Sequence, residues 1–89
     1  MKSLHCVVTG NVDSGSFLAW VHDQAAALSL TGWVRKLETG KVEVLAQGDE
    51  EGANKLRTLL KQGSALSGIL EMKADWIDYE KSYDRFEMR

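Results

Sequence analysis

Residues 31–48 decide the fold, and they read TGWVRKLETGKVEVLAQG. Residues 31–37 and 41–47 are both strand-like, and the second segment alternates apolar and polar side chains. Between them, Glu38, Thr39 and Gly40 supply a short glycine-containing turn. The stretch therefore predicts a β-hairpin.

Apolar spacing predicts the elements before the hairpin. Alternation over residues 4–9 indicates a first strand that ends at Gly10, and residues 11–16 form a polar loop. We expect Ser16 to cap the helix that follows. Its buried stripe falls at helical spacing on Phe17, Trp20, Val21, Ala25 and Leu28.

The second half predicts a helix and two more strands. Asp49 is placed as the N-cap of the helix, and Gly63 marks its end. The buried face of this helix is expected to be Ala53, Leu56, Leu59 and Leu60. Alternating residues then predict a half-buried strand with Leu70, Met72, Ala74 and Trp76 inward, and a short final strand containing Phe86 and Met88.

This order, β-α-β-β-α-β with a terminal strand, predicts an α+β fold. Two helices that each need a sheet to cover favour a two-layer, ferredoxin-like sandwich. A chain of 89 residues has room for one such core, so residues 1–89 are expected to form a single domain.

Composition excludes several classes of partner. The formal net charge is −2 and neither half of the chain is basic, which argues against nucleic acid and anionic membranes. No apolar run approaches the ~18 residues of a membrane-spanning helix. Cys6 is the only cysteine, in an apolar strand, so we expect a buried structural thiol and a cytoplasmic protein.

Three motifs resemble those of a known family. Residues 10–18 read GNVDSGSFL, residues 32–36 read GWVRK, and residues 40–43 read GKVE. They are similar, at matching spacing, to the acylphosphatase motifs Gly-x-Val-Gln-Gly-Val-x-Phe-Arg, Gly-Trp-Val-Arg-Asn and Gly-x-Val-Glu. The similarity continues to the closing FEMR, so the chain is identified as a member of the acylphosphatase family from end to end.

The resemblance implies a phosphate-binding loop. Its backbone N–H groups would point at one spot where the loop enters a helix, and such a cradle favours anions. In the family, an arginine clamps the phosphate and an asparagine holds the attacking water, and the chemistry needs no metal or cofactor. On this sequence the loop consists of Asn11, Val12, Asp13, Ser14, Gly15, Ser16 and Phe17.

Both catalytic positions differ here. Leu18 stands at the arginine position and Lys36 at the asparagine position. Leucine carries no charge, and an arginine in other phosphoryl-transfer sites supplies roughly 10³- to 10⁵-fold in rate. Asp13 replaces a glutamine, and its carboxylate at ~6 Å would repel a phosphate charge by about 3 kcal/mol at an effective dielectric near 20. We therefore expect acylphosphatase activity to be absent or very weak.

Three possibilities for the function stay open at this point. The first is a non-catalytic binding or interaction module that keeps an anion-binding loop for phosphate or another small anion. The alternative is a weak or altered metal-independent hydrolase of acyl phosphates that uses Lys36 as its cation. A protein partner or a second copy bound through a free sheet edge is the third.

The remaining candidates have structural explanations. No histidine supports Ser14 or Ser16 as a nucleophile, and no set of residues has metal-ligand spacing. Alternation places Arg35 on the face opposite Lys36, in a structural or surface role. We expect Trp20, Trp33 and Trp76 to belong to the core.

Overall fold

The predicted order of elements is confirmed by a computed structural model, which describes residues 1–12, 14–63 and 68–89. The elements are β1 (Lys2–Gly10), α1 (Gly15–Ala27), β2 (Thr31–Glu38), β3 (Lys41–Gln47), α2 (Glu50–Gln62), β4 (Ile69–Asp78) and β5 (Phe86–Met88). The sequence from β1 to β4 is the expected β-α-β-β-α-β arrangement, with β5 as the terminal strand. The ferredoxin-like α+β sandwich is therefore the observed fold.

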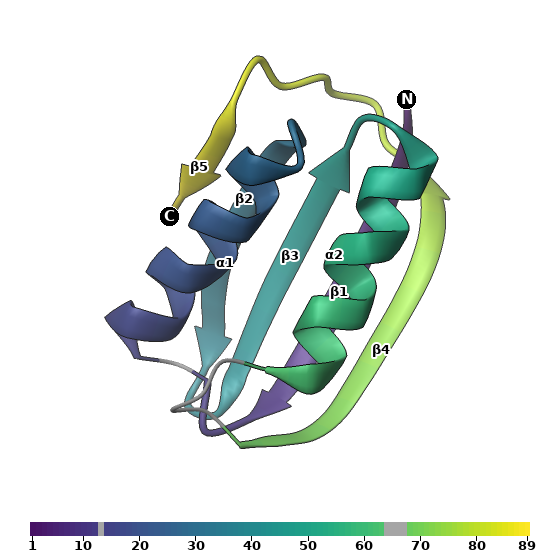
Figure 1. Cartoon of the computed structure of the whole chain (residues 1–89). Coiled ribbons are helices and arrows are strands. Elements are labelled where there is room, and N and C mark those ends of the chain that lie inside the picture. Colours follow the sequence, from purple (N-terminus) through teal and green to yellow (C-terminus); the bar gives the residue numbers. More distant parts are fainter. Residues whose placement is uncertain (13, 64–67) are drawn as a thin grey trace.

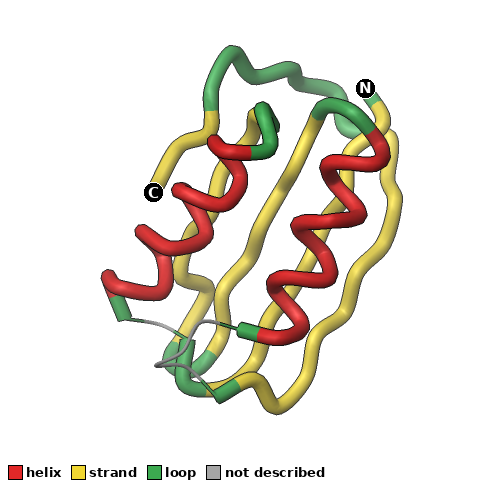
Figure 2. The backbone as a smooth tube through the Cα atoms, viewed as in Figure 1, coloured by secondary structure: helices red, strands yellow, loops and turns green. Residues whose placement is uncertain are grey.

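The strands form one sheet in the order β4-β1-β3-β2-β5. Neighbouring strands are antiparallel except β2 and β5, which run parallel. Both helices cover the same face of this sheet, with α2 on the side of β4 and α1 on the side of β5 (Figure 1). The segment between β4 and β5 passes over one end of the sheet to reach the opposite edge (Figure 2).

The core lies between the helices and the sheet. Every second residue of β1, β2 and β3 faces the helices, as the alternation predicts. The core cluster comprises Leu4, Cys6, Val8, Val12, Phe17, Val21, Ala25, Leu30, Val34, Val42, Val44, Ala46, Ala53, Leu56, Leu60 and Phe86. The buried thiol of Cys6 belongs to it, and burial raises the pKa of that thiol to about 12, so the group stays protonated and inert at neutral pH.

The N-cap of α1 is Ser14, so the prediction of Ser16 is wrong. The Ser14 hydroxyl accepts a hydrogen bond from the Phe17 N–H at 3.3 Å, and the helix begins at Gly15. Ser16 lies inside the first turn and is exposed. Asp49 does occupy the N-cap position of α2, although its side chain makes no capping hydrogen bond.

Leu70 was expected to be half-buried, and it is instead 84% exposed. The pairing of β1 with β4 shifts here, because Thr9 faces Glu71 while Gly10 faces Ile69. Leu70 is the extra residue of this β-bulge, and a bulge changes the direction in which a side chain points. The alternation of Met72, Ala74 and Trp76 beyond it holds.

Trp33 is buried, but not in the core that the sequence predicted. It alternates with Val34, which faces the helices, so its ring lies on the other face of the sheet. There its Nε1 donates to the Tyr83 hydroxyl at 3.1 Å, and only 3% of the residue is exposed. Trp20 and Trp76 do pack against the core cluster, as expected.

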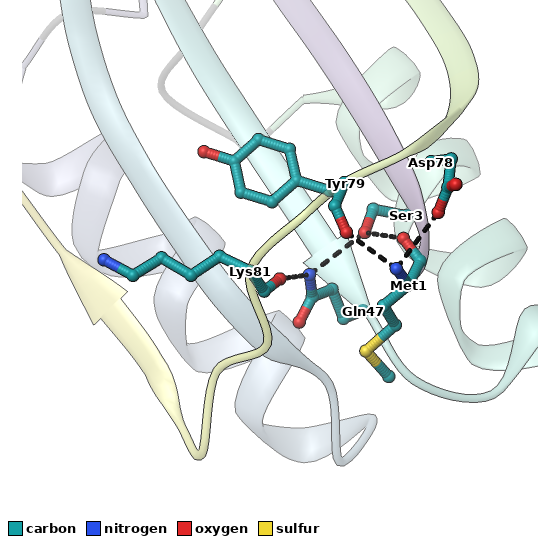
Figure 3. A network of polar contacts seen from close by, with 6 residues as sticks. All are labelled: Met1, Ser3, Gln47, Asp78, Tyr79 and Lys81. Carbon is teal, nitrogen blue, oxygen red and sulfur yellow. Dashed lines mark hydrogen bonds and ion pairs between the residues drawn. The ribbon is translucent and has the colours of Figure 1, made fainter.

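A buried glutamine fastens the crossing segment to the end of the sheet. The Gln47 Nε2 donates to the Ser3 Oγ at 3.0 Å and to the Lys81 carbonyl at 2.7 Å (Figure 3). Its Oε1 accepts from the Tyr83 N–H at 3.1 Å. One amide thus joins β3, β1 and the segment that leads to β5, using both ends of its side chain.

Replacing Gln47 by alanine should lower the free energy of unfolding by roughly 2–4 kcal/mol, because the substitution leaves the Lys81 carbonyl and the Tyr83 N–H without their partner. Urea unfolding followed by circular dichroism measures the change. Gln62→Ala, at an exposed position at the end of α2, is the matched control and should change stability by less than about 0.5 kcal/mol. Equal effects of the two substitutions would contradict the role of Gln47.

Candidate anion-binding site

Two backbone hydrogen bonds fix the start of the β1–α1 loop. The Gly10 N–H donates to the Gly40 carbonyl, and the Asn11 N–H donates to the Gly68 carbonyl, both at 2.9 Å. Gly10 has a φ of 147°, and a Cβ there would come within 2.1 Å of the Gly68 oxygen. Only glycine permits this approach, so the loop is anchored between the β2–β3 turn and the residue before β4.

The start of α1 supplies the backbone donors of the site. Ser14 already occupies two of them, since its carbonyl accepts from Phe17 and Leu18 at 3.1 and 3.2 Å. The N–H groups of Gly15 and Ser16 lie in the first helical turn, where no intrahelical carbonyl can reach them. In the described first turn of α1, these two groups and the positive end of the helix dipole can act on an anion.

The structure divides the predicted loop into anchors and surface residues. Val12 and Phe17 are buried in the core, and they hold the loop against the sheet. Asn11, Ser14, Gly15 and Ser16 are exposed. The remaining predicted member, Asp13, lies outside the described residues.

Leu18 follows in the same helical turn and is half-buried. Its side chain packs against the core cluster, next to the helix residues that cover β2. At this position the family motif has an arginine, whose charge would have to reach the loop. Leu18 contributes apolar contact and neither charge nor a side-chain hydrogen bond.

Lys36 is exposed on β2, opposite Val42 of β3. Counting by two from Val34 places its side chain on the same side of the sheet as the helices. The hairpin end that carries it is bonded to Gly10 through Gly40, so Lys36 and the loop lie at the same end of the sheet. Leu18 lies in the first turn of the helix that this loop enters, so the two motif positions lie at the same end of the molecule, with the loop between them.

Arg35 points to the opposite face, as predicted, where it joins a charged cluster that the sequence analysis missed. Its Nε donates to Glu43 at 2.7 Å, and the other oxygen of Glu43 lies 2.6 Å from the His5 Nε2. Arg35 and Arg89 also lie over the Trp33 ring, at 4.8 and 5.3 Å from its centroid. The strand register, which places Glu43 opposite Arg35, is the signal that could have found this cluster.

Within the cluster, opposing effects act on the Glu43 carboxylate. Partial burial works to raise the pKa of Glu43, but the hydrogen bonds from His5 and Arg35 outweigh it and lower that pKa below its usual value of 4.5.

Nothing here resembles a metal centre: the described part of the chain holds no group of three or more His, Cys, Asp or Glu side chains that could bind an ion. No helix among the described residues is long and apolar enough to cross a membrane.

Glu43→Gln should reduce stability at pH 7 by about 1–3 kcal/mol, because hydrogen bonds to the charged form are lost. A carboxyl group with a lowered folded-state pKa stabilises the protein above its unfolded pKa, and this contribution disappears as the pH falls through the folded value. The difference between wild type and variant should therefore shrink below pH 4.5. Urea unfolding across the acid range measures it, with Glu38→Gln, at the exposed end of β2, as the control. A difference independent of pH would refute the assignment.

Comparison with known proteins supports the same conclusion as the fold and the loop. The family model for acylphosphatase matches residues 4–88. The acylphosphatase of Caldanaerobacter subterraneus is 31% identical over 98% of this chain and 97% of its own length, and that of Pelotomaculum thermopropionicum is 34% identical over 94% and 91%. A solved acylphosphatase from Coxiella burnetii superposes with a TM-score of 0.91 at 30% identity, over 99% of this chain and 92% of that one. The chain belongs to the acylphosphatase family.

Proposed function

We propose that this family member is a binding module that does not carry out ordinary acyl-phosphate hydrolysis, and that its loop holds phosphate or another small anion. The observation that carries the proposal is Leu18, which packs into the helix–sheet interface at the motif arginine position. Without a guanidinium, no side chain at that position can neutralise charge that gathers on a transferring phosphoryl group.

The anion-binding half of the proposal rests on the backbone. A loop that is anchored by Gly10 and Asn11 presents the first turn of a 13-residue helix, and helix N-termini bind anions without needing a charged side chain. The first turn of α1 contains no acidic residue, whereas that of α2 contains Glu50 and Glu51. Among the residues that the structure describes, the first turn of α1 is therefore better suited to a negatively charged ligand than that of α2.

A second function, weak hydrolysis of acyl phosphates, is favoured by the place of Lys36. This cation stands at the loop end of β2 on the helix side, where its charge can act on a bound phosphate. In such a reaction, water would attack the acyl phosphate directly, so positioning and charge would supply the rate. Lys36 would then be the group on which that activity depends.

Hydrolysis of benzoyl phosphate separates the two functions. Wild type should hydrolyse benzoyl phosphate no faster than buffer alone, and Leu18→Arg/Lys36→Asn, which restores the motif residues, should exceed that rate at least roughly 100-fold. Leu18→Gln/Lys36→Asn, with a polar but uncharged side chain at position 18, is the matched control and should stay close to wild type. Activity in wild type that Lys36→Ala abolishes would favour the weak hydrolase instead.

Titration with sodium phosphate at constant ionic strength tests binding apart from catalysis. We expect saturable backbone amide shifts at Gly15 and Ser16, because their N–H groups are the donors left in the first turn of α1. The Glu51 amide in the first turn of α2 is an internal control, since its acidic neighbourhood repels phosphate. An absence of shifts at α1 would exclude the anion site, whatever the result with benzoyl phosphate.

A further inference from the structure

The second helix and the edge strand β4 line an open groove on the surface. Its floor is apolar and is made by Met72 and Ala74 of β4. Its rim is made by Arg57, Thr58 and Lys61, which follow one another along one side of α2. The hollow measures about 460 Å³. Figure 1 shows α2 running alongside part of β4.

The outer side of β4 is open to strand addition. The strand is ten residues long, lies at the edge of the sheet and, among the described strands, pairs with β1 alone. An edge strand of this length presents unpaired backbone N–H and C=O groups, to which an extended peptide can add. Side chains of such an added strand alternate between the two faces, so every second one would enter the groove beneath α2.

The positive side chains on the rim of the groove favour a negatively charged ligand. Arg57 and Lys61 are exposed, and neither makes an ion pair with any of the described residues. Lys55, on another side of α2, is by contrast within 4.0 Å of Glu51. Arg57 and Lys61 lie one helical turn apart above the apolar floor. A glutamate or aspartate side chain could place its methylene groups on that floor and its carboxylate against the two cations.

The same charges argue against a second copy of this chain. In an antiparallel β4–β4 pair, the two α2 helices would meet over the joint on the same face of the continuous sheet, since both helices cover that face. Arg57 and Lys61 would then stand opposite their own copies, with four like charges gathered around one groove. Like charges brought together in this way oppose pairing, while an acidic partner relieves them.

We propose that β4 and α2 form a docking site for an extended acidic peptide segment of another protein. The peptide adds as a strand to the free edge of β4, and its glutamate or aspartate side chains enter the groove toward Arg57 and Lys61. This inference is independent of the anion-binding loop.

Fluorescence anisotropy with a labelled ETEVETE peptide tests the proposal, because its glutamates all lie on one side of an extended strand. We expect saturable binding that Arg57→Gln/Lys61→Gln weakens about ten-fold. The control Lys41→Gln/Lys55→Gln removes the same charge outside the groove and should bind like wild type. The uncharged peptide QTQVQTQ should bind at least about ten-fold more weakly than ETEVETE. Circular dichroism establishes that both variants fold.

Amide shifts in the presence of ETEVETE locate the binding. The proposal requires shifts along β4, at Met72 to Trp76, that excess inorganic phosphate does not reverse. Shifts confined to Gly15 and Ser16 would overturn it, because the peptide would then be using the anion-binding loop. Equal weakening by both double variants, no saturation at millimolar peptide, or concentration-dependent dimerisation through β4 would overturn it as well.

Discussion

The register that joins β1, β3 and β2 is the constraint on which the rest of this structure depends. It aligns Cys6, Val44 and Val34 on the helix side of the sheet, and one step away it aligns Glu43 and Arg35 on the other side. A shift of one residue would exchange the two faces and bury charged side chains under the helices. The same register places Lys36, and not Arg35, on the side where the loop enters α1.

Close backbone contact is what assembles the candidate site. Gly10 lets β1 approach Gly68, and Gly32 lies so near the Leu45 carbonyl that a Cβ there would come within 1.9 Å of its oxygen. Both residues have positive φ, at 147° and 131°, where a side chain is strained. Gly32 pairs with Ala46, at the end of β3 away from the loop, so the site itself depends on Gly10, and its donors are backbone groups that the anchored loop orients.

The two faces of the sheet use polar residues differently. Under the helices the described core is apolar, whereas the other face holds the Arg35–Glu43–His5 cluster and the buried Gln47. The segment between β4 and β5 passes over Gln47 at one end of that face. There the Gln47 side chain provides the hydrogen-bond partners of the Lys81 carbonyl and the Tyr83 N–H. Arg57 and Lys61 on α2 make no ion pair with the described residues, and these are the charges on which the proposed peptide site depends.

The sequence by itself determined the order of elements, the helix-facing alternation and the family, because period and motif are local properties of the chain. The sequence motifs also identified Leu18 and Lys36 as the residues at the family's arginine and asparagine positions. The bulge at Leu70 and the Tyr83 partner of Trp33 were decided by tertiary structure, since each depends on which strand or segment lies alongside. The Ser14 cap is a local hydrogen bond to Phe17, so its misplacement at Ser16 was an error in reading a local pattern. Pairing across β1, β3 and β4 is non-local, and so are the Glu43 cluster and the α2–β4 groove that it creates.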